Sequence, residues 1–111
     1  MPAIHLKTSV SIENEEELLK SLSKELSSLT SKPESYVMSS IEESIPMTFG
    51  GSADPCCYLE VKSIGAIHPE KMSNAFCKII SSKTGIPISR IYIEFSDVEA
   101  KFWGWNGSTF G

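Results

Sequence analysis

The stretch Lys32-Pro33-Glu34-Ser35-Tyr36-Val37 joins a helical pattern to a strand pattern, and Ile86-Pro87-Ile88-Ser89-Arg90-Ile91 does the same about half a chain later. Both stretches contain Pro-x-Ser and then apolar residues that are typical of a strand. Because proline does not continue a helix, each stretch marks the end of a helix and the approach to the next strand. The repeat therefore predicts a duplicated strand–helix–strand unit.

The first unit begins with loosely alternating apolar residues over positions 3–10, which predict a strand. A helix follows, because Asn14 can act as its N-cap and Glu17 occupies the capping-box position. We expect this helix to end over residues 31–33, and residues 36–41 to form the second strand. The apolar face of the helix consists of Leu18, Leu19, Leu22, Leu26 and Leu29.

The second unit follows a loop over residues 44–55 that is rich in proline and glycine. Residues 56–65 predict a third strand. Pro69 suits the first turn of a second helix, and Gly85 suits its end. Residues 91–95 predict a fourth strand, before a glycine-rich and aromatic tail. The buried stripe of the second helix is expected to contain Met72, Ala75, Phe76, Ile79 and Ile80.

The predicted fold class is α+β, a two-layer α/β sandwich that forms one domain over residues 1–111. Its four-stranded sheet has duplicated β-α-β units and two helices on one face. Strand–helix–strand crossovers imply parallel pairing within each unit. The strands also have apolar residues for the uncovered face, so we expect that face to pack against a partner, most simply another copy of the chain.

Composition excludes several classes of function. The net charge is −4 and no basic cluster is present, which argues against nucleic-acid binding. No stretch approaches the ~20 apolar residues of a membrane span. The chain does not begin with a basic region and an apolar run, so we expect no signal peptide, a cytoplasmic location and, if the protein is exported, an unconventional route.

The three cysteines, Cys56, Cys57 and Cys77, make a poor disulfide framework because their number is odd and two are adjacent. In a strand, Cys56 and Cys57 would point to opposite faces. Neither His5 nor His68 has partners at ligand spacing, so no metal site is predicted.

Pro2 is a candidate general base. A small residue after the initiator methionine allows Met1 to be removed, which would leave Pro2 with a free secondary amine. Free α-amino groups titrate near pH ~8, and burial in an apolar pocket lowers that value. A base that titrates near neutral pH is suited to proton transfer.

Several short motifs, in this order and spacing, make the chain similar nearly end to end to the macrophage migration inhibitory factor family of the tautomerase superfamily. They include Met1-Pro2, Lys32-Pro33, the run Met47-Thr48-Phe49-Gly50-Gly51-Ser52, Ser63-Ile64-Gly65 and the segment 104–110. The resemblance implies a homotrimer whose three sheets enclose a central channel, with an active site at each subunit interface and no cofactor. It also implies an isomerase that catalyses keto–enol tautomerisation of arylpyruvates such as phenylpyruvate, and of dopachrome-like compounds.

The resemblance also implies roles for individual residues. Pro2 would be the catalytic base, and Lys32 would meet the carboxylate or carbonyl oxygen of a small aromatic keto acid. The backbone N–H of Ile64 would contact the substrate, and Tyr92 would come from the neighbouring subunit. Without the resemblance, Lys32 would be a solvated residue at a helix end and Tyr92 a core aromatic. The other expected substrate-binding residues are Glu94, Trp103, Trp105 and Phe110.

Two positions depart from the mammalian members of the family. Glu94 replaces an asparagine; a carboxylate near Pro2 would raise the pKa of the amine and repel an anionic substrate, unless the side chain points away. Trp103 replaces a small aliphatic residue, and either narrows the pocket mouth or packs on the surface beside Trp105.

Other functions remain alternatives. The mammalian Cys-x-x-Cys is broken because Leu59 stands at its second position, so we expect no thiol oxidoreductase activity that uses this motif. The charged positions linked to receptor binding are not clearly matched. A cytokine-like signalling or binding protein with vestigial tautomerase activity stays open, as does use of the same proline in decarboxylation or hydration of another substrate.

Overall fold

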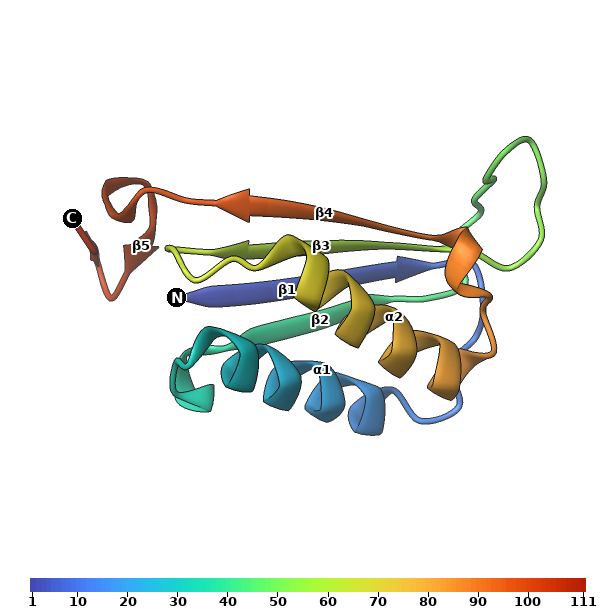
Figure 1. Cartoon of the computed structure of the whole chain (residues 1–111), viewed down its shortest axis with the longest axis horizontal. Helices are drawn as coiled ribbons and strands as arrows, with labels where there is room; N and C mark the ends of the chain where they lie inside the picture. Colours follow the sequence, from blue (N-terminus) through green and yellow to red (C-terminus); the bar gives the residue numbers. More distant parts are fainter.

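A computed structural model describes all of residues 1–111. Two helices, α1 (Glu15–Thr30) and α2 (Pro69–Thr84), lie side by side on one face of a sheet (Figure 1). The sheet has the strand order β2-β1-β3-β4. Its strands are β1 (Pro2–Thr8), β2 (Met38–Glu42), β3 (Cys57–Ser63) and β4 (Ile91–Asp97).

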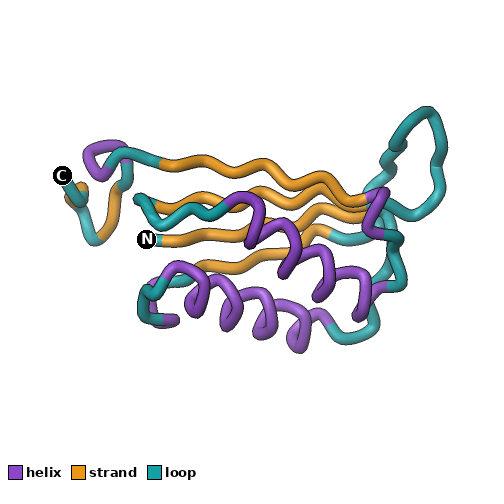
Figure 2. The backbone as a smooth tube through the Cα atoms, in the orientation of Figure 1, coloured by secondary structure: helices purple, strands orange, loops and turns teal.

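Strand pairing confirms the predicted α+β fold with duplicated units. β1 pairs with β2 in parallel, β3 pairs with β4 in parallel, and the two units join through the antiparallel pair β1–β3. The backbone trace shows the two crossovers through α1 and α2 on the same side of the sheet (Figure 2). None of the helices is both long and apolar enough to cross a membrane.

The core lies between the helices and the sheet. Strand residues alternate, so that Ile4 and Leu6 of β1 and Leu59 and Val61 of β3 point toward the helices and are fully buried. Burial of each such side chain contributes about 1.5–3 kcal/mol. The predicted apolar helix faces are confirmed, with three positions fully buried on each helix: Leu18, Leu22, Leu26, Met72, Phe76 and Ile80.

The helix ends follow the sequence signals. Asn14 accepts a hydrogen bond from the Glu17 backbone N–H at 3.1 Å, and its side-chain amide donates to the Glu17 carboxylate at 3.1 Å. This pair of contacts caps α1. α2 ends at Gly85, whose φ of +77° favours a residue without Cβ. Lys83 near the end of α2 contacts Glu17 at 2.8 Å and links the two helices.

The repeated Pro-x-Ser stretches adopt the same structure. Each proline is followed by a turn of 3₁₀ helix, Glu34–Tyr36 before β2 and Ile88–Arg90 before β4. The prediction that the second strand starts at Tyr36 was therefore wrong, because the chain completes this turn first. The tail forms a small hairpin, β5 (Gly104–Trp105) and β6 (Ser108–Thr109), which periodicity did not predict.

The three cysteines are free thiols, and Cys56 and Cys57 are each 1% exposed. Cys56 precedes β3, and its backbone is held by Ser9 Oγ at 3.1 Å and by Thr8 Oγ1 at 2.9 Å. Burial, and then the neighbouring Cys56 and Cys77, raise the pKa of the Cys57 thiol to about 12. Such a thiol is almost fully protonated near neutral pH.

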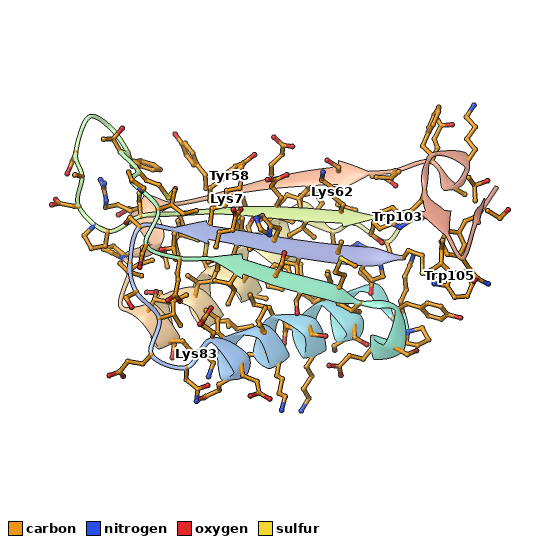
Figure 3. All side chains as sticks on the ribbon, turned by 180° about the vertical axis from the view of Figure 1, so that it is seen from behind. Lys7, Tyr58, Lys62, Lys83, Trp103 and Trp105 are labelled. Atoms are coloured by element: carbon orange, nitrogen blue, oxygen red, sulfur yellow. The ribbon has the colours of Figure 1, made fainter.

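The sheet face away from the helices, here called the open face, is polar rather than apolar. His5 contacts Glu42 at 2.6 Å and the Ser40 hydroxyl, Tyr58 donates to Glu94 at 3.1 Å, and further charges line the face (Figure 3). Apolar residues are present here as expected, since Met38 and Tyr92 are 71% and 65% exposed, but alternation directs most apolar strand residues to the helices. By register, the open face comprises Ala3, His5, Lys7, Met38, Ser40, Glu42, Tyr58, Glu60, Lys62, Tyr92, Glu94 and Ser96.

The loop 43–56 projects from the sheet end opposite the N-terminus (Figure 1). Its tip is a tight turn in which Phe49 and Ser52 exchange backbone hydrogen bonds of 2.9 and 3.1 Å. Arg90 holds the second half of the loop, because its guanidinium donates to the carbonyl oxygens of Phe49, Ser52, Asp54 and Pro55 at 2.9–3.2 Å. It also lies 5.2 Å from the Phe49 ring centre.

We predict that Arg90→Lys lowers the free energy of unfolding by roughly 1–3 kcal/mol, since an ammonium cannot reproduce the planar set of charged hydrogen bonds. Urea unfolding measures this loss, and limited proteolysis tests whether the loop 43–56 opens. Lys78→Ala, at an exposed position of α2, is the control and should change neither result. An Arg90→Lys protein as stable as the parent, with an equally resistant loop, would contradict the assignment.

Candidate active site

A cavity of about 300 Å³ lies at the sheet end where β1 begins. Its volume is at the lower end of the ~300–1,000 Å³ range of small-molecule sites. Three parts of the chain form it: the start of β1, the segment that leads into β2, and the C-terminal hairpin, where Figure 3 shows Trp103 and Trp105. The lining residues are Met1, Pro2, Ala3, Ser35, Tyr36, Val37, Met38, Trp103, Gly104, Trp105 and Phe110.

Aromatic rings wall this cavity. Trp105 and Phe110 stack with ring centres 5.8 Å apart and planes inclined by 13°. Tyr36 meets Trp105 edge-on, with 6.0 Å between ring centres. The Phe110 backbone N–H donates to the Trp103 carbonyl at 3.2 Å, so the hairpin itself sets the positions of these rings. Flat apolar walls with aromatic faces suit a planar aromatic ligand.

Two amines, the Met1 α-amino group and the side chain of Lys32, lie close together beside Pro2. Pro2 is buried, and the Met1 α-amino group beside it is close to Lys32. Burial, and then the hydrogen bond and positive charge of Lys32, lower the pKa of the Met1 α-amino group from 8.0 to about 6. Desolvation and a like charge both disfavour the protonated form, so the Met1 α-amino group is mostly neutral at pH 7.

Lys32 is fixed in place by the end of α1. Ser31 adopts a left-handed conformation with φ of +56°, which turns the chain out of the helix. The Lys32 backbone N–H still donates to Ser27 O at 3.2 Å. Its side chain then extends to the residue after β3, where Nζ donates to the Ile64 carbonyl oxygen at 2.5 Å. The structure thus brings together Lys32 and Ile64, which lie 32 residues apart.

Tyr92 and Glu94 are not in this cavity. By register, Tyr92 is level with Lys7 and Glu94 with His5. At about 3.3 Å per residue along a strand, Tyr92 is about 16 Å and Glu94 about 10 Å beyond Pro2. Tyr92 is 65% exposed and packs on Phe49, with ring centres 4.5 Å apart. Within one chain, neither residue reaches Pro2.

Sequence reasoning missed several residues of the cavity. Tyr36 and Met38 line it because the 3₁₀ turn delays the start of β2. Ser63, which does not line the cavity, was noted only as part of a motif, yet it is the register partner of Pro2. An alignment of the strands by their alternating pattern would have placed it there.

No three His, Cys, Asp or Glu side chains gather in a way that could hold a metal ion.

Comparisons with known proteins identify the family of the chain. The family model described as "Macrophage migration inhibitory factor (MIF)" matches residues 1–111. The chain therefore belongs to the macrophage migration inhibitory factor family. This family is part of the tautomerase superfamily, and membership supports a tautomerase or cytokine-like role in general terms.

Individual relatives cover nearly the whole chain. A macrophage migration inhibitory factor of Xenopus laevis is 38% identical and covers 99% of each chain. A homologue from Brugia malayi is 42% identical over 84% of each chain. Among solved structures, a macrophage migration inhibitory factor homologue from Prochlorococcus marinus has a TM-score of 0.94 and 48% identity, and covers 98% of this chain and 99% of that one.

The lowered pKa of the Met1 α-amino group predicts a pH dependence in protein that retains Met1. The folded state binds this proton with a pKa of about 6 and the unfolded state near 8.0, so between these values the unfolded state binds more protons. The free energy of unfolding should therefore rise with pH through this window. Lys32→Ala should raise the amine pKa only part of the way, because burial remains.

An NMR titration of Met1 selectively labelled at Cα measures this pKa directly. Lys20→Ala is the matched control, since Lys20 lies on the exposed side of the same helix and pairs with Glu16 at 3.0 Å. An unperturbed amine near pH 8, or equal effects of the two lysine substitutions, would contradict the arrangement.

Proposed function

We propose that this protein is a cofactor-independent keto–enol tautomerase of arylpyruvates such as phenylpyruvate, and that the Pro2 amine, freed by removal of Met1, is its general base. One observation carries the proposal. A buried proline lies in an aromatic cavity, next to the Met1 α-amino group, whose pKa burial and then Lys32 lower to about 6; the Pro2 amine would experience the same two effects once Met1 is removed. Dopachrome-like compounds present a similar flat ring and would be accepted as well.

The chemistry is a proton transfer within the substrate. The neutral Pro2 nitrogen takes a proton from the carbon next to the ketone, the C–H electron pair forms the carbon–carbon double bond, and negative charge develops on the ketone oxygen. Lys32 stabilises that charge or binds the substrate carboxylate. The prolinium then returns the proton to the oxygen, which gives the enol, and the reverse sequence restores the ketone.

The substrate ring would lie between the aromatic walls. Trp105 and Phe110 offer their faces, and Trp103 lies at the pocket margin where it limits the size of the ring that enters. The Ile64 carbonyl already binds Lys32, and the Ile64 backbone N–H would be the contact for a substrate oxygen.

A complete site would also require residues from a second copy of the chain. We infer a homotrimer, in which Tyr92 and Glu94 of one copy, on the open face of its sheet, would reach the Pro2 cavity of a neighbour. Two observations support this: both residues are too far from Pro2 in their own chain, and they are exposed. Sedimentation equilibrium determines the number of copies.

The alternative within the same family is a signalling or receptor-binding protein that keeps the proline without using it. The two roles separate at Pro2, because loss of the secondary amine would stop turnover without altering the outer surface. A third alternative is that the protein uses Pro2 in the decarboxylation or hydration of a different substrate. That activity would also depend on Pro2.

We predict that Pro2→Gly lowers phenylpyruvate tautomerase kcat/KM by about 10²–10⁴-fold, the usual contribution of a general base. Intact mass on the same preparations must show that Met1 is absent from both proteins. Pro87→Gly, at the proline that precedes the 3₁₀ turn before β4 and lies outside the cavity, is a control that should keep turnover. Full activity of processed Pro2→Gly would overturn the proposed mechanism.

We also predict that Glu94→Asn raises kcat/KM for phenylpyruvate and moves the acid limb of its pH profile to lower pH. In the trimer, the carboxylate would raise the pKa of Pro2 and repel the anionic substrate, and an amide does neither. Glu16→Gln makes the same change in net charge on the exposed face of α1 and should leave the profile unchanged. Identical kinetics for Glu94→Asn and the parent would show that Glu94 faces away from the site.

A further inference from the structure

Ser63 contains a buried hydroxyl that no other group satisfies. It is the last residue of β3 and is 0% exposed. Among the buried side-chain nitrogen and oxygen atoms of the chain, Ser63 Oγ is the one without a hydrogen-bond partner. Its backbone carbonyl, in contrast, accepts from the Val98 N–H at 2.9 Å. A buried hydroxyl without a partner destabilises the folded state, so its retention at this position needs an explanation.

Pro2 is directly opposite Ser63. The two residues are register partners in the antiparallel pair β1–β3, and both side chains are buried on the helix side of the sheet. Cα atoms of directly opposed residues are about 4.5–5.5 Å apart, so the Ser63 hydroxyl is within reach of the Pro2 nitrogen. Lys32, which binds the next residue of the chain through the Ile64 carbonyl, borders the same point.

The state of Met1 decides whether Pro2 can bond to this hydroxyl. While Met1 is attached, the Pro2 nitrogen is a tertiary amide without a hydrogen atom, so it offers neither a donor nor a basic lone pair. Removal of Met1 turns it into a secondary amine. The neutral amine has one N–H and one lone pair, and the protonated amine has two N–H groups. In both forms a serine hydroxyl oxygen can accept one N–H.

We propose that Ser63 is a positioning residue for the Pro2 amine: its hydroxyl oxygen accepts the amine N–H and so directs the nitrogen lone pair into the aromatic cavity. The inference rests on the proposed function, because it gives orientation to the base assumed there. The proposed contact also depends on the removal of Met1. The hydroxyl is unpartnered in the chain that retains Met1 and becomes partnered when Met1 is removed.

A stability cycle tests the contact without any need for turnover. It compares the parent and Ser63→Ala, each prepared in two forms: processed, and released from a fusion by a protease that leaves Met1 in place. In the processed form, Ser63→Ala should lower Tm because a hydrogen bond is lost. In the Met1-retaining form the same substitution should leave Tm unchanged or raise it, because an unsatisfied hydroxyl is removed.

Thr8 provides a matched control on the same sheet face. Thr8 is also 0% exposed, but its hydroxyl donates to the Cys56 carbonyl at 2.9 Å, at the far end of β1. Thr8→Val should therefore lower Tm equally in both forms. Equal effects of Ser63→Ala in the two forms would overturn the proposed contact.

Kinetics test the positioning role. In processed protein, Ser63→Ala should lower phenylpyruvate kcat/KM by about tenfold, which corresponds to the loss of one hydrogen bond. It should also move the acid limb of the pH profile to lower pH, since the hydroxyl oxygen favours the protonated amine. Ser63→Thr keeps the hydroxyl and should restore the position of that limb. A merely structural role would not move it, so an unchanged limb in Ser63→Ala would overturn the inference.

The outcomes separate this inference from the proposed function. If Pro2→Gly keeps full turnover, Pro2 is not the base, and the stability cycle still decides whether Ser63 binds its amine. A different result is that Pro2→Gly abolishes turnover, while Ser63→Ala has equal effects on Tm in the two forms and leaves the pH profile unchanged. In that case Pro2 is still the base, and the role of Ser63 is refuted.

Discussion

The antiparallel register between β1 and β3 is the constraint on which the rest of this structure depends. It aligns Pro2 with Ser63 and Thr8 with Cys57, and it joins two otherwise separate strand–helix–strand units. A slip of one residue would turn Ile4 and Leu6 away from the helices and bring His5 toward them. The shifted register is excluded because it would bury a polar or charged side chain and would also lose the burial of apolar ones.

The same register determines where the site can lie. With β1 and β3 fixed, Pro2 is at the end of the sheet toward which β3 and β4 run. The segment after β4 must therefore leave the sheet beside Pro2, and it returns as the hairpin that holds Trp105 and Phe110. Lys32 approaches from the other layer, because α1 ends over the same edge. The pairing of β1 with β3 therefore brings the end of β3, the C-terminal hairpin and the end of α1 close to Pro2.

Much of this arrangement could be predicted from the sequence, since the signals involved are local. Proline, glycine and the Asn14 cap mark the helix ends, and the leucine spacing gives the buried face of α1. The number of polar residues on the open face was not predicted, because it depends on which strand residues alternate inward, and apolar content alone does not reveal that. The cavity residues Tyr36 and Met38, and the pairing of Ser63 with Pro2, required three-dimensional register.

Lys32 links the electrostatics of the floor to the chemistry that we propose for it. Its ammonium donates to the Ile64 carbonyl, which supplies a dipole but no negative charge, so the positive charge of Lys32 is not neutralised there. After burial, which is the largest cause, the hydrogen bond and positive charge of Lys32 lower the pKa of the Met1 α-amino group to about 6, and the proposed mechanism requires the same effects on the Pro2 amine. The same charge attracts a carboxylate and favours an enolate over a neutral ketone. A neutral hydrogen-bond donor at position 32 would supply only the weaker, dipolar part of both effects, so the proposed mechanism requires a cation at this position.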